Sequence, residues 1–175
     1  MDIKEFLEQS IGNWFSLRTA YQLNKGETEN SKSEISLEIL LPEHPEVISL
    51  CQEYDLDPNL SLGGQKTTWD NSVDWGKPKQ KGSVIIVLIP DENNWEVGKL
   101  LRKAEKAQAK NTLGRYSLAK DNSLTLIIES DNIYSEERIS FASPNLRLRT
   151  TATKYGNNYS DTAFYSEIRK IPPKS

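Results

Sequence analysis

The feature that most constrains this chain is the recurrence of short alternating segments separated by turn signals. Residues 34–39, for example, alternate between glutamate or serine and isoleucine or leucine, which is typical of a strand with one buried face. About ten such strands are expected, at residues 14–23, 34–39, 64–70, 84–89, 96–102, 113–118, 124–128, 137–143, 146–154 and 159–169. With mostly hairpin-length gaps, they predict a mainly β fold, an antiparallel meander closed into a barrel.

Short helices are expected beside the strands. Apolar residues between Ile3 and Ile11 fall on one helical face, and Gly12 follows as a stop signal. A second helix fits residues 43–54, where prolines stand at the start and an Asp-Pro pair follows the end. The polar segment 103–110 fits a helical turn or a loop, and the sequence does not decide between them.

Composition excludes several classes of protein. The 175 residues are expected to form a single domain over 1–175. A net charge of −3 and the lack of a long basic run give no charge reason to bind nucleic acid. No stretch approaches ~18 apolar residues, so no membrane span is expected. The charged N-terminal residues predict no secretory signal. We therefore expect a soluble, intracellular protein.

The scarcity of cysteine and histidine narrows the chemistry. Cys51 is the single cysteine, which excludes an internal disulfide framework and a multi-cysteine metal site. His44 is the single histidine, which excludes a histidine zinc cluster and makes a Ser-His-Asp triad improbable. No metal site is therefore expected. We interpret Cys51 as a buried hydrophobe and His44 as an exposed structural residue at the start of the second helix.

One local pattern favours a barrel over a sandwich. The first helix leads into Gly12-Asn13-Trp14 at the start of the first strand. This Gly-x-Trp arrangement is seen in lipocalin-like barrels, where the tryptophan closes the barrel floor and an arginine from the last strand stacks on it. Arg169 is the candidate for that arginine. Closed barrels of this size hold one small ligand.

Arg147 and Arg149 form the sharpest candidate site. Residues i and i+2 of a strand point to the same face, so the two guanidinium groups project side by side. Two parallel arginine forks suit a ligand with two carboxylates or phosphates. The alternative is that both arginines lie on a solvated strand face.

A run of charged residues precedes that strand. Alternation puts Glu136 and Arg138 on one face of a strand and Glu137 on the other. A carboxylate that faces a barrel interior can accept N–H donors or hold a proton. We expect Glu136 to share a cleft with the arginine pair. The alternative is a charge cluster at a hairpin edge.

Two tryptophans and a carboxylate form a third cluster. Trp69 and Trp75 share a strand face if the segment continues extended, or they meet across a hairpin, and Asp70 lies next to the first of them. Aromatic walls with one carboxylate suit a flat conjugated ligand, whereas the alternative is a pair of core or rim tryptophans. Together these clusters predict a small barrel that binds a planar, di-anionic ligand.

The chain resembles the CpcS/CpeS (S/U-type) phycobiliprotein chromophore lyases over essentially its full length. The most specific match is the string Phe141-Ala142-Ser143-Pro144-Asn145-Leu146-Arg147-Leu148-Arg149. Further matching stretches are Ser10-Ile11-Gly12-Asn13-Trp14-Phe15-Ser16-Leu17-Arg18-Thr19, Asp55-Leu56-Asp57-Pro58, Trp69-Asp70, Gly98-Lys99-Leu100-Leu101-Arg102, Gly114-Arg115-Tyr116, Ile133-Tyr134-Ser135-Glu136-Glu137-Arg138 and Ser166-Glu167-Ile168-Arg169. This family's fold is a ten-stranded antiparallel, lipocalin-like (calycin) barrel with short accessory α-helices, in agreement with the strand pattern.

The resemblance implies a lyase that binds a linear tetrapyrrole (bilin), either phycocyanobilin or phycoerythrobilin, and attaches it through a thioether to a cysteine of a phycobiliprotein α or β subunit. The bilin is the substrate, and no further cofactor is implied. The nucleophilic thiol belongs to the acceptor, so Cys51 is dispensable. The implied site consists of Asp70 and Glu136 as catalytic carboxylates, and Arg18, Tyr21, Trp69, Trp75, Arg147 and Arg149 as ligand contacts.

The sequence departs from the family pattern in one place. Many S-type members carry two histidines after Arg-Thr, whereas here Ala20, Tyr21 and Gln22 follow Arg18 and Thr19. Loss of both imidazoles fits a U-type subunit that works in a heterodimer with an S-type lyase, and a noncovalent bilin carrier is the alternative. A homodimer is also compatible with the sequence. The resemblance implies the cyanobacterial cytoplasm, or a plastid if the source is algal.

Overall fold

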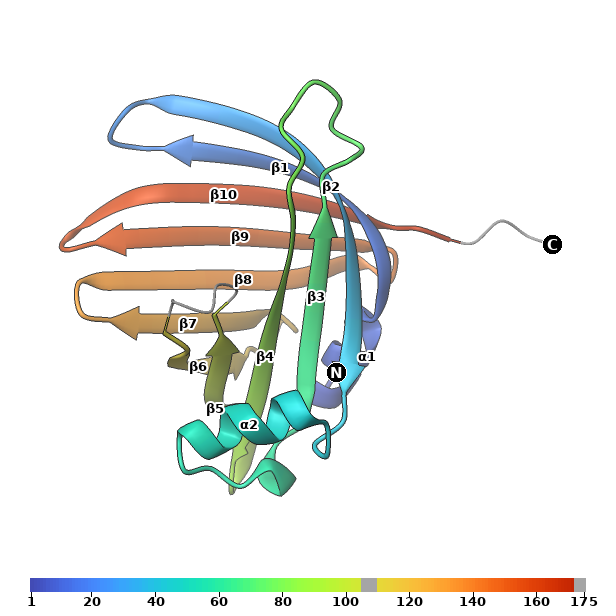
Figure 1. Ribbon diagram of the computed structural model, residues 1–175, viewed down its shortest axis with the longest axis vertical. Coiled ribbons are helices and arrows are strands. Elements are labelled where there is room, and N and C mark those ends of the chain that lie inside the picture. Colours follow the sequence, from blue (N-terminus) through green and yellow to red (C-terminus); the bar gives the residue numbers. More distant parts are fainter. Residues whose placement is uncertain (105–109, 172–175) are drawn as a thin grey trace.

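Ten antiparallel strands form a closed barrel in the computed structural model, which describes residues 1–104 and 110–171. The elements are α1 (Ile3–Ser10), β1 (Gly12–Gln22), β2 (Glu27–Leu40), α2 (Pro45–Glu53), the 3-10 turn η1 (Pro58–Leu60), β3 (Gly64–Asp70), β4 (Lys81–Asp91), β5 (Asn94–Lys103), β6 (Thr112–Leu118), β7 (Leu124–Ser130), β8 (Ile133–Ser143), β9 (Leu146–Tyr155) and β10 (Asn158–Arg169). Each strand pairs with the next along the chain, and β1 also pairs with β10 (Figure 1). The predicted barrel is therefore confirmed.

The strands differ from the expected ranges mainly at their polar ends. β2 begins at Glu27 rather than at Glu34, because residues 27–33 are polar on both faces and carry no hydrophobic period. These residues pair with residues 16–22 of β1, and Ser31 and Ser33 line the interior. The segment 103–110, which fitted a turn or a loop, lies mostly outside the described residues.

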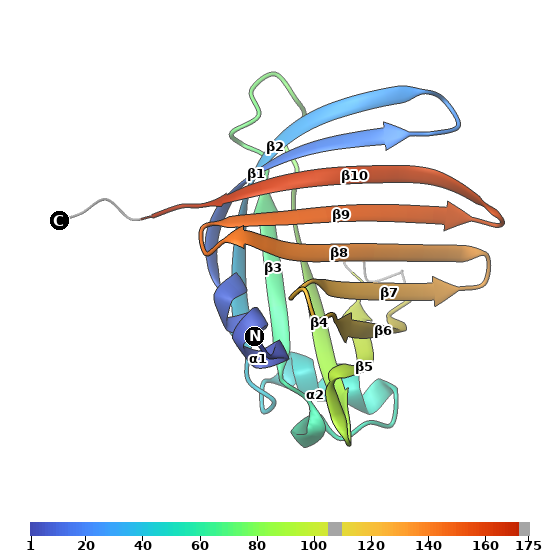
Figure 2. The same ribbon diagram turned by 180° about the vertical axis from the view of Figure 1, so that it is seen from behind.

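Helix α1 closes one end of the barrel. A capping box starts it, because the Asp2 carboxylate accepts a hydrogen bond from the Glu5 N–H and the Glu5 carboxylate accepts one from the Asp2 N–H. Its buried residues Ile3 and Phe6 pack against Leu88, Leu100, Tyr116, Leu118, Leu124, Leu126 and Ile139 from the strands. Figure 2 shows α1 against this end of the sheet. The core therefore fills only the end that α1 covers.

Trp14 and Arg169 lock this closed end together. Trp14 is fully buried, and its Nε1–H donates to the Ser10 carbonyl at 2.9 Å. The Arg169 guanidinium stacks over the Trp14 ring at 4.2 Å and donates to the carbonyls of Gln9 and Ile11 at the end of α1. Gly12 has φ +127°, and an added Cβ would meet Arg169 at 3.0 Å. The predicted pairing of Trp14 with Arg169 is confirmed.

Helix α2 covers the outer face of β4 and β5. Val47, Leu50 and Cys51 of the helix are buried against outward-facing strand residues, among them Val87 and Leu101. The apolar run 84–89 is therefore covered on both sides, as expected for a strand without alternation. Burial also raises the pKa of the Cys51 thiol, in agreement with its interpretation as a buried hydrophobe. The described helices include none that is long and apolar enough to span a membrane.

His44 caps α2 rather than taking part in a site. Its Nδ1 accepts a hydrogen bond from the Glu46 N–H at 3.1 Å, and Pro45 occupies the first helical position. The expected structural role at the start of the helix is confirmed, although the side chain is half-buried rather than exposed.

We predict that Arg169→Lys lowers the free energy of unfolding by about 1–3 kcal/mol, because a lysine cannot donate to several carbonyls while lying flat on an indole ring. Chemical denaturation monitored by tryptophan fluorescence measures the change. The matched control is Lys170→Gln, which removes an exposed ion pair to Glu34 and should have little effect. Equal stability of Arg169→Lys and the wild type would contradict the locking role of Arg169.

Candidate functional site

A cavity of about 610 Å³ occupies the part of the barrel that the core does not fill. Part of its wall is apolar and comes from Ile35, Trp69, Ile86, Leu126, Ile128 and Ile139. The remainder is polar and includes Ser16, Arg18, Gln65, Arg102, Thr112, Glu137, Arg147, Arg149 and Tyr165. A cavity that combines apolar surface with convergent polar groups can hold a small molecule that carries both kinds of surface.

A buried ion-pair network forms the most polar part of the wall. Glu167 is fully buried and accepts hydrogen bonds from Arg147 Nη1 at 2.7 Å and from Arg149 Nε. Arg149 Nη1 also donates to Glu137 Oε1 at 3.0 Å. The network follows from the register, which pairs Arg147 of β9 with Glu167 of β10. Two positive and two negative charges balance, so this wall is polar but has no net charge.

The network determines the ionisation of its central carboxyl. Burial by itself would raise the pKa of Glu167, but Arg149 and Arg147 outweigh burial through their charges and hydrogen bonds, so the pKa is lowered. Glu167 therefore stays ionised at neutral pH. Removing one partner of such a pair leaves an uncompensated buried charge.

Tyr165 connects the network to Arg18. The register places Arg18 of β1, Tyr165 of β10 and Arg149 of β9 in one row. The Arg18 Nε–H donates to the Tyr165 hydroxyl at 3.2 Å, and the Arg149 guanidinium lies 4.0 Å from the Tyr165 ring. Arg18 has no carboxylate within 4.0 Å among the described residues. Its charge is therefore available to a ligand.

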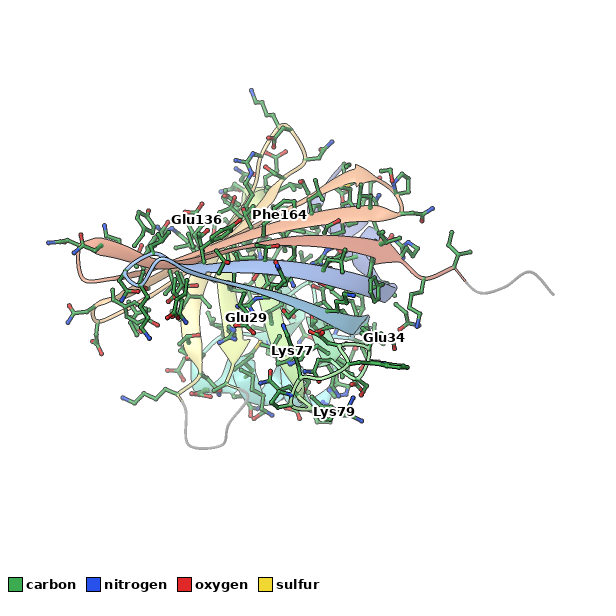
Figure 3. The ribbon with its side chains drawn as sticks, turned by 90° about the horizontal axis from the view of Figure 1, so that it is seen from above. Glu29, Glu34, Lys77, Lys79, Glu136 and Phe164 are labelled. Carbon is green, nitrogen blue, oxygen red and sulfur yellow. The ribbon has the colours of Figure 1, made fainter. Side chains whose placement is uncertain are left out.

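The structure confirms that Arg147 and Arg149 share the inner face of β9, but it corrects the placement of Glu136. Glu136 is absent from the cavity wall, and its carboxylate accepts a hydrogen bond from the Tyr134 hydroxyl at 2.6 Å. That bond raises the pKa of Tyr134 to about 12. In Figure 3, Glu136 and Phe164 are labelled in the upper part of the view, and Lys77 and Lys79 in the lower part. The expectation that Glu136 shares a cleft with the arginine pair is wrong.

The physical reason is the strand period. β8 pairs with its neighbours so that Ile139 is buried in the core, and residues two apart share a face. Glu137 therefore faces the cavity and Glu136 faces outward. A one-residue error in choosing the inward face exchanges the roles of adjacent carboxylates.

Only one member of the tryptophan cluster lies in the cavity wall. Trp69 lines it, whereas Asp70 has the opposite orientation on β3 and accepts hydrogen bonds from Ser72 and the ammonium of Lys81. The hydrogen bonds from Ser72, with a smaller contribution from Lys81, lower the pKa of Asp70. β3 ends at Asp70, and Trp75 follows in the β3–β4 connection with 89% of its surface exposed. Asp70 and Trp75 therefore do not line the cavity, in contrast to Trp69, and the ligand contacts expected of them stay predictions.

Tyr21 is also outside the cavity wall. It lies near the end of β1, on the face opposite Arg18, and is 43% exposed. Strand alternation predicts this orientation, so a direct ligand contact through Tyr21 is not supported by its position. Arg18 itself lines the cavity.

Three important residues are not among the predicted site residues. Glu137 and Tyr165 line the cavity, and Glu167 is fully buried and accepts hydrogen bonds from two wall residues, Arg147 and Arg149. Glu137 was placed on the other face from Glu136 without being chosen, Glu167 was noted only within a matching stretch, and Tyr165 gave no signal. A usable clue exists for Glu167, because it lies two residues before Arg169 on the last strand. Residues two apart on a strand share a face, and Arg169 contacts the buried Trp14. Glu167 is therefore turned to the same side and is buried, and a buried glutamate needs a cationic partner.

The closed antiparallel barrel is filled at one end by a helix and a tryptophan, and it is hollow toward the other end, where polar groups converge. This arrangement defines a lipocalin-type barrel for a single small ligand. Comparison with known proteins narrows this class. Residues 2–170 match the family described as CpeS-like protein. The chain belongs to this family.

Individual relatives are similar to this chain over nearly its full length. "Chromophore lyase CpcS/CpeS" of Thermosynechococcus vestitus is 46% identical over 169 residues, which cover 97% of this chain and 93% of the relative. "Phycocyanobilin lyase subunit CpcS" of a Picosynechococcus strain is 37% identical and covers 96% of this chain, with 86% of the relative matched. The solved structure of the S-type phycobiliprotein lyase CPES from Guillardia theta superposes with a TM-score of 0.83 at 28% identity, over 99% of this chain and 95% of that structure.

We predict that Glu167→Gln lowers the free energy of unfolding at pH 7 by about 3–5 kcal/mol, the scale for breaking a buried ion pair. The difference from the wild type should narrow as the pH falls below about 4.3, the ordinary glutamate value. The pKa of Glu167 is lowered in the folded state, so below this pH the Glu167 carboxylate is protonated in the unfolded wild type before it is protonated in the folded protein. The wild type therefore loses the stability that the ionised carboxylate contributes.

Denaturant unfolding at a series of pH values measures this difference. The matched control is Glu129→Gln, which removes an exposed partner of Arg115 and should have little effect. A Glu167→Gln protein as stable as the wild type at pH 7 would show that the network does not stabilise the barrel.

Proposed function

We propose that this protein is a phycobiliprotein chromophore lyase, which holds a bilin in the barrel cavity and attaches it to a cysteine of a phycobiliprotein subunit. The observation that carries the proposal is the cavity itself, an enclosure of about 610 Å³ with apolar and charged walls. It occurs in a chain that is 46% identical to a protein named as a chromophore lyase. A flat, conjugated, di-anionic tetrapyrrole matches both kinds of wall.

The reaction is an addition that loses no atoms. The sulfur of the acceptor thiol bonds to the exocyclic ethylidene carbon of ring A, the carbon–carbon double bond is consumed, and the thiol proton ends on the neighbouring ring carbon. Because the nucleophile comes from the acceptor, the lyase must hold ring A near the cavity mouth in one orientation. Such positioning supplies much of the rate enhancement in reactions of this type.

Glu137 is the carboxylate that we assign to the bilin. Its side chain faces the cavity, and Arg149 holds one of its oxygens at 3.0 Å. The other oxygen is then directed toward a ligand, where it can accept pyrrole N–H donors. A carboxylate in this place favours the protonated tetrapyrrole, which makes the ethylidene carbon more electrophilic. Glu136 and Asp70, the carboxylates predicted for this role, point outward.

The remaining wall residues suit binding. Trp69 offers an aromatic surface against which a conjugated ring can lie. The Arg18 guanidinium donates a hydrogen bond to the Tyr165 hydroxyl and has no carboxylate partner among the described residues. This charge suits a propionate. Arg147 and Arg149 line the cavity as well, but their charges are already balanced by Glu167 and Glu137. We therefore propose that these two arginines mainly orient Glu137.

We predict that Glu137→Gln slows covalent attachment by at least tenfold, because the amide cannot favour the protonated bilin. Its neighbour Glu136→Gln is the matched control and should transfer bilin at the wild-type rate, since it lies on the outer face of the same strand. Single-turnover transfer to an acceptor subunit, followed by the visible absorbance of the adduct, measures both. A slower Glu136→Gln together with an unaffected Glu137→Gln would reverse the assignment.

A second candidate function is that of a lyase subunit or bilin carrier with no transfer activity of its own. Two observations favour it, namely the absence of both histidines after Thr19 and a relative that is named as a lyase subunit. In that case a partner lyase supplies the missing catalytic group. The cavity and the bound bilin would be the same.

Reconstitution separates these functions. The purified chain is mixed with phycocyanobilin or phycoerythrobilin and with an isolated phycobiliprotein α or β subunit, in the presence or absence of an S-type lyase. We predict that bilin binds the chain alone, which is seen as a change in visible absorbance, and that an S-type partner accelerates the formation of an adduct that survives denaturation. Efficient transfer by the chain alone excludes the subunit role, and no absorbance change with either bilin contradicts both functions.

A further inference from the structure

A second polar cluster lies in the cavity wall, on strands that the network of Glu167 does not touch. Gln65 of β3, Arg102 of β5 and Thr112 of β6 all line the cavity. Gln65 is only 7% exposed, yet its side-chain Nε2 has no hydrogen-bond partner in the described part of the chain. The buried Oγ1 of Thr112 also lacks a partner among those residues. Buried donors without partners are costly, and they are expected where a ligand supplies the acceptor.

The strand register places these three residues in one row. Gln65 pairs with Ile86, Ile86 pairs with Arg102, and Arg102 pairs with Thr112. Side chains that are directly opposite each other on neighbouring strands have Cβ atoms about 5 Å apart. The side chains of Arg102 and Thr112 are therefore within reach of a single small group, and Gln65 is two strands away on the same inner face.

Arg102 differs from the other cavity arginines in its charge environment. Arg147 and Arg149 each have a glutamate partner within 4.0 Å, and Arg18 is held by a tyrosine hydroxyl. Arg102 has neither within the described residues 1–104 and 110–171. An anion that enters the cavity therefore meets a guanidinium without a carboxylate partner among the described residues at Arg102, as it does at Arg18, and a neutral surface at Arg147 and Arg149.

We propose that Arg102, Thr112 and Gln65 form an anion site for one carboxylate of the bound ligand, with Arg102 and Thr112 donating to the carboxylate and Gln65 donating to a neighbouring polar atom. The identity of that carboxylate as a bilin propionate rests on the proposed function. In the strand order of the barrel, β3–β6 lie across from β9 and β10, so the site is opposite the network of Glu167. A ligand anchored at both walls has one orientation in the cavity.

The position of the site also indicates which part of the ligand is near solvent. Arg102 is next to the last residue of β5, and Thr112 is the first residue of β6, so both lie toward the open rim. Arg102 is exposed, although it lines the cavity. A charged carboxylate in this place keeps part of its hydration.

The test compares phycocyanobilin with its dimethyl ester, which keeps the tetrapyrrole but removes both negative charges. Dissociation constants are measured by absorbance titration for the wild type, Arg102→Gln, Arg102→Lys and Thr112→Val. We expect Arg102→Gln to bind the free acid about tenfold more weakly than the wild type and to bind the ester equally well. Arg102→Lys should recover part of the loss, and Thr112→Val should show a smaller loss that is also confined to the free acid.

Arg115→Gln is the matched control, because Arg115 lies on the outer face of β6 and pairs with Glu129. It should bind both forms as the wild type does. Unchanged binding of the free acid by Arg102→Gln overturns the proposal, and so does an equal loss for acid and ester, which would mark Arg102 as merely structural. A wild type that binds neither form overturns the proposed function itself, an outcome distinct from a variant-specific result.

Discussion

The fully buried carboxylate of Glu167 determines how this barrel is organised. An ionised glutamate in the interior requires cationic partners, and Arg147 and Arg149 on the neighbouring strand supply them. This requirement fixes the inner face of β9 and β10. Because side chains alternate with a period of two, it also fixes the faces of the adjacent strands, with Tyr165 and Glu137 turned inward.

The same interaction shapes the chemistry of the cavity. The arginines of the network are balanced by glutamates, so this wall is polar but has no net charge. Glu137 lines the cavity, and among the described residues only its Oε1 has a hydrogen-bond partner, which is Arg149. Positive charge remains at Arg18 and Arg102, on different strands. The cavity thus separates groups that suit N–H donors from groups that suit carboxylates. Under the proposed function, the bilin carries both kinds of group and would therefore be held in one orientation.

Sequence reasoning predicted the barrel, its strand number, the short helices and the contact between Trp14 and Arg169, because each depends on local periodicity or on one specific motif. It also placed Arg147 and Arg149 on a common face. It selected Glu136 instead of Glu137, since alternation says that neighbours face opposite ways but not which of them faces inward. The burial of Ile139 on the same strand settles that choice.

Other site residues were out of reach for different physical reasons. Trp75 lies in a connection whose course depends on where β3 ends, and the pairing of Arg147 with Glu167 depends on the register between β9 and β10. Gln65, Arg102 and Thr112 come together only through the pairing of four strands. No spacing along the chain encodes such a row.

A crystal structure of the protein with phycocyanobilin tests the central claim most directly, because it locates the chromophore relative to the inner and outer faces of β8. We predict electron density for the bilin inside the barrel, with its rings against Trp69, a pyrrole N–H within hydrogen-bond distance of Glu137, and ring A toward the open rim. A bilin bound on the outer surface beside Glu136 or Trp75, with the cavity free of chromophore, would contradict it.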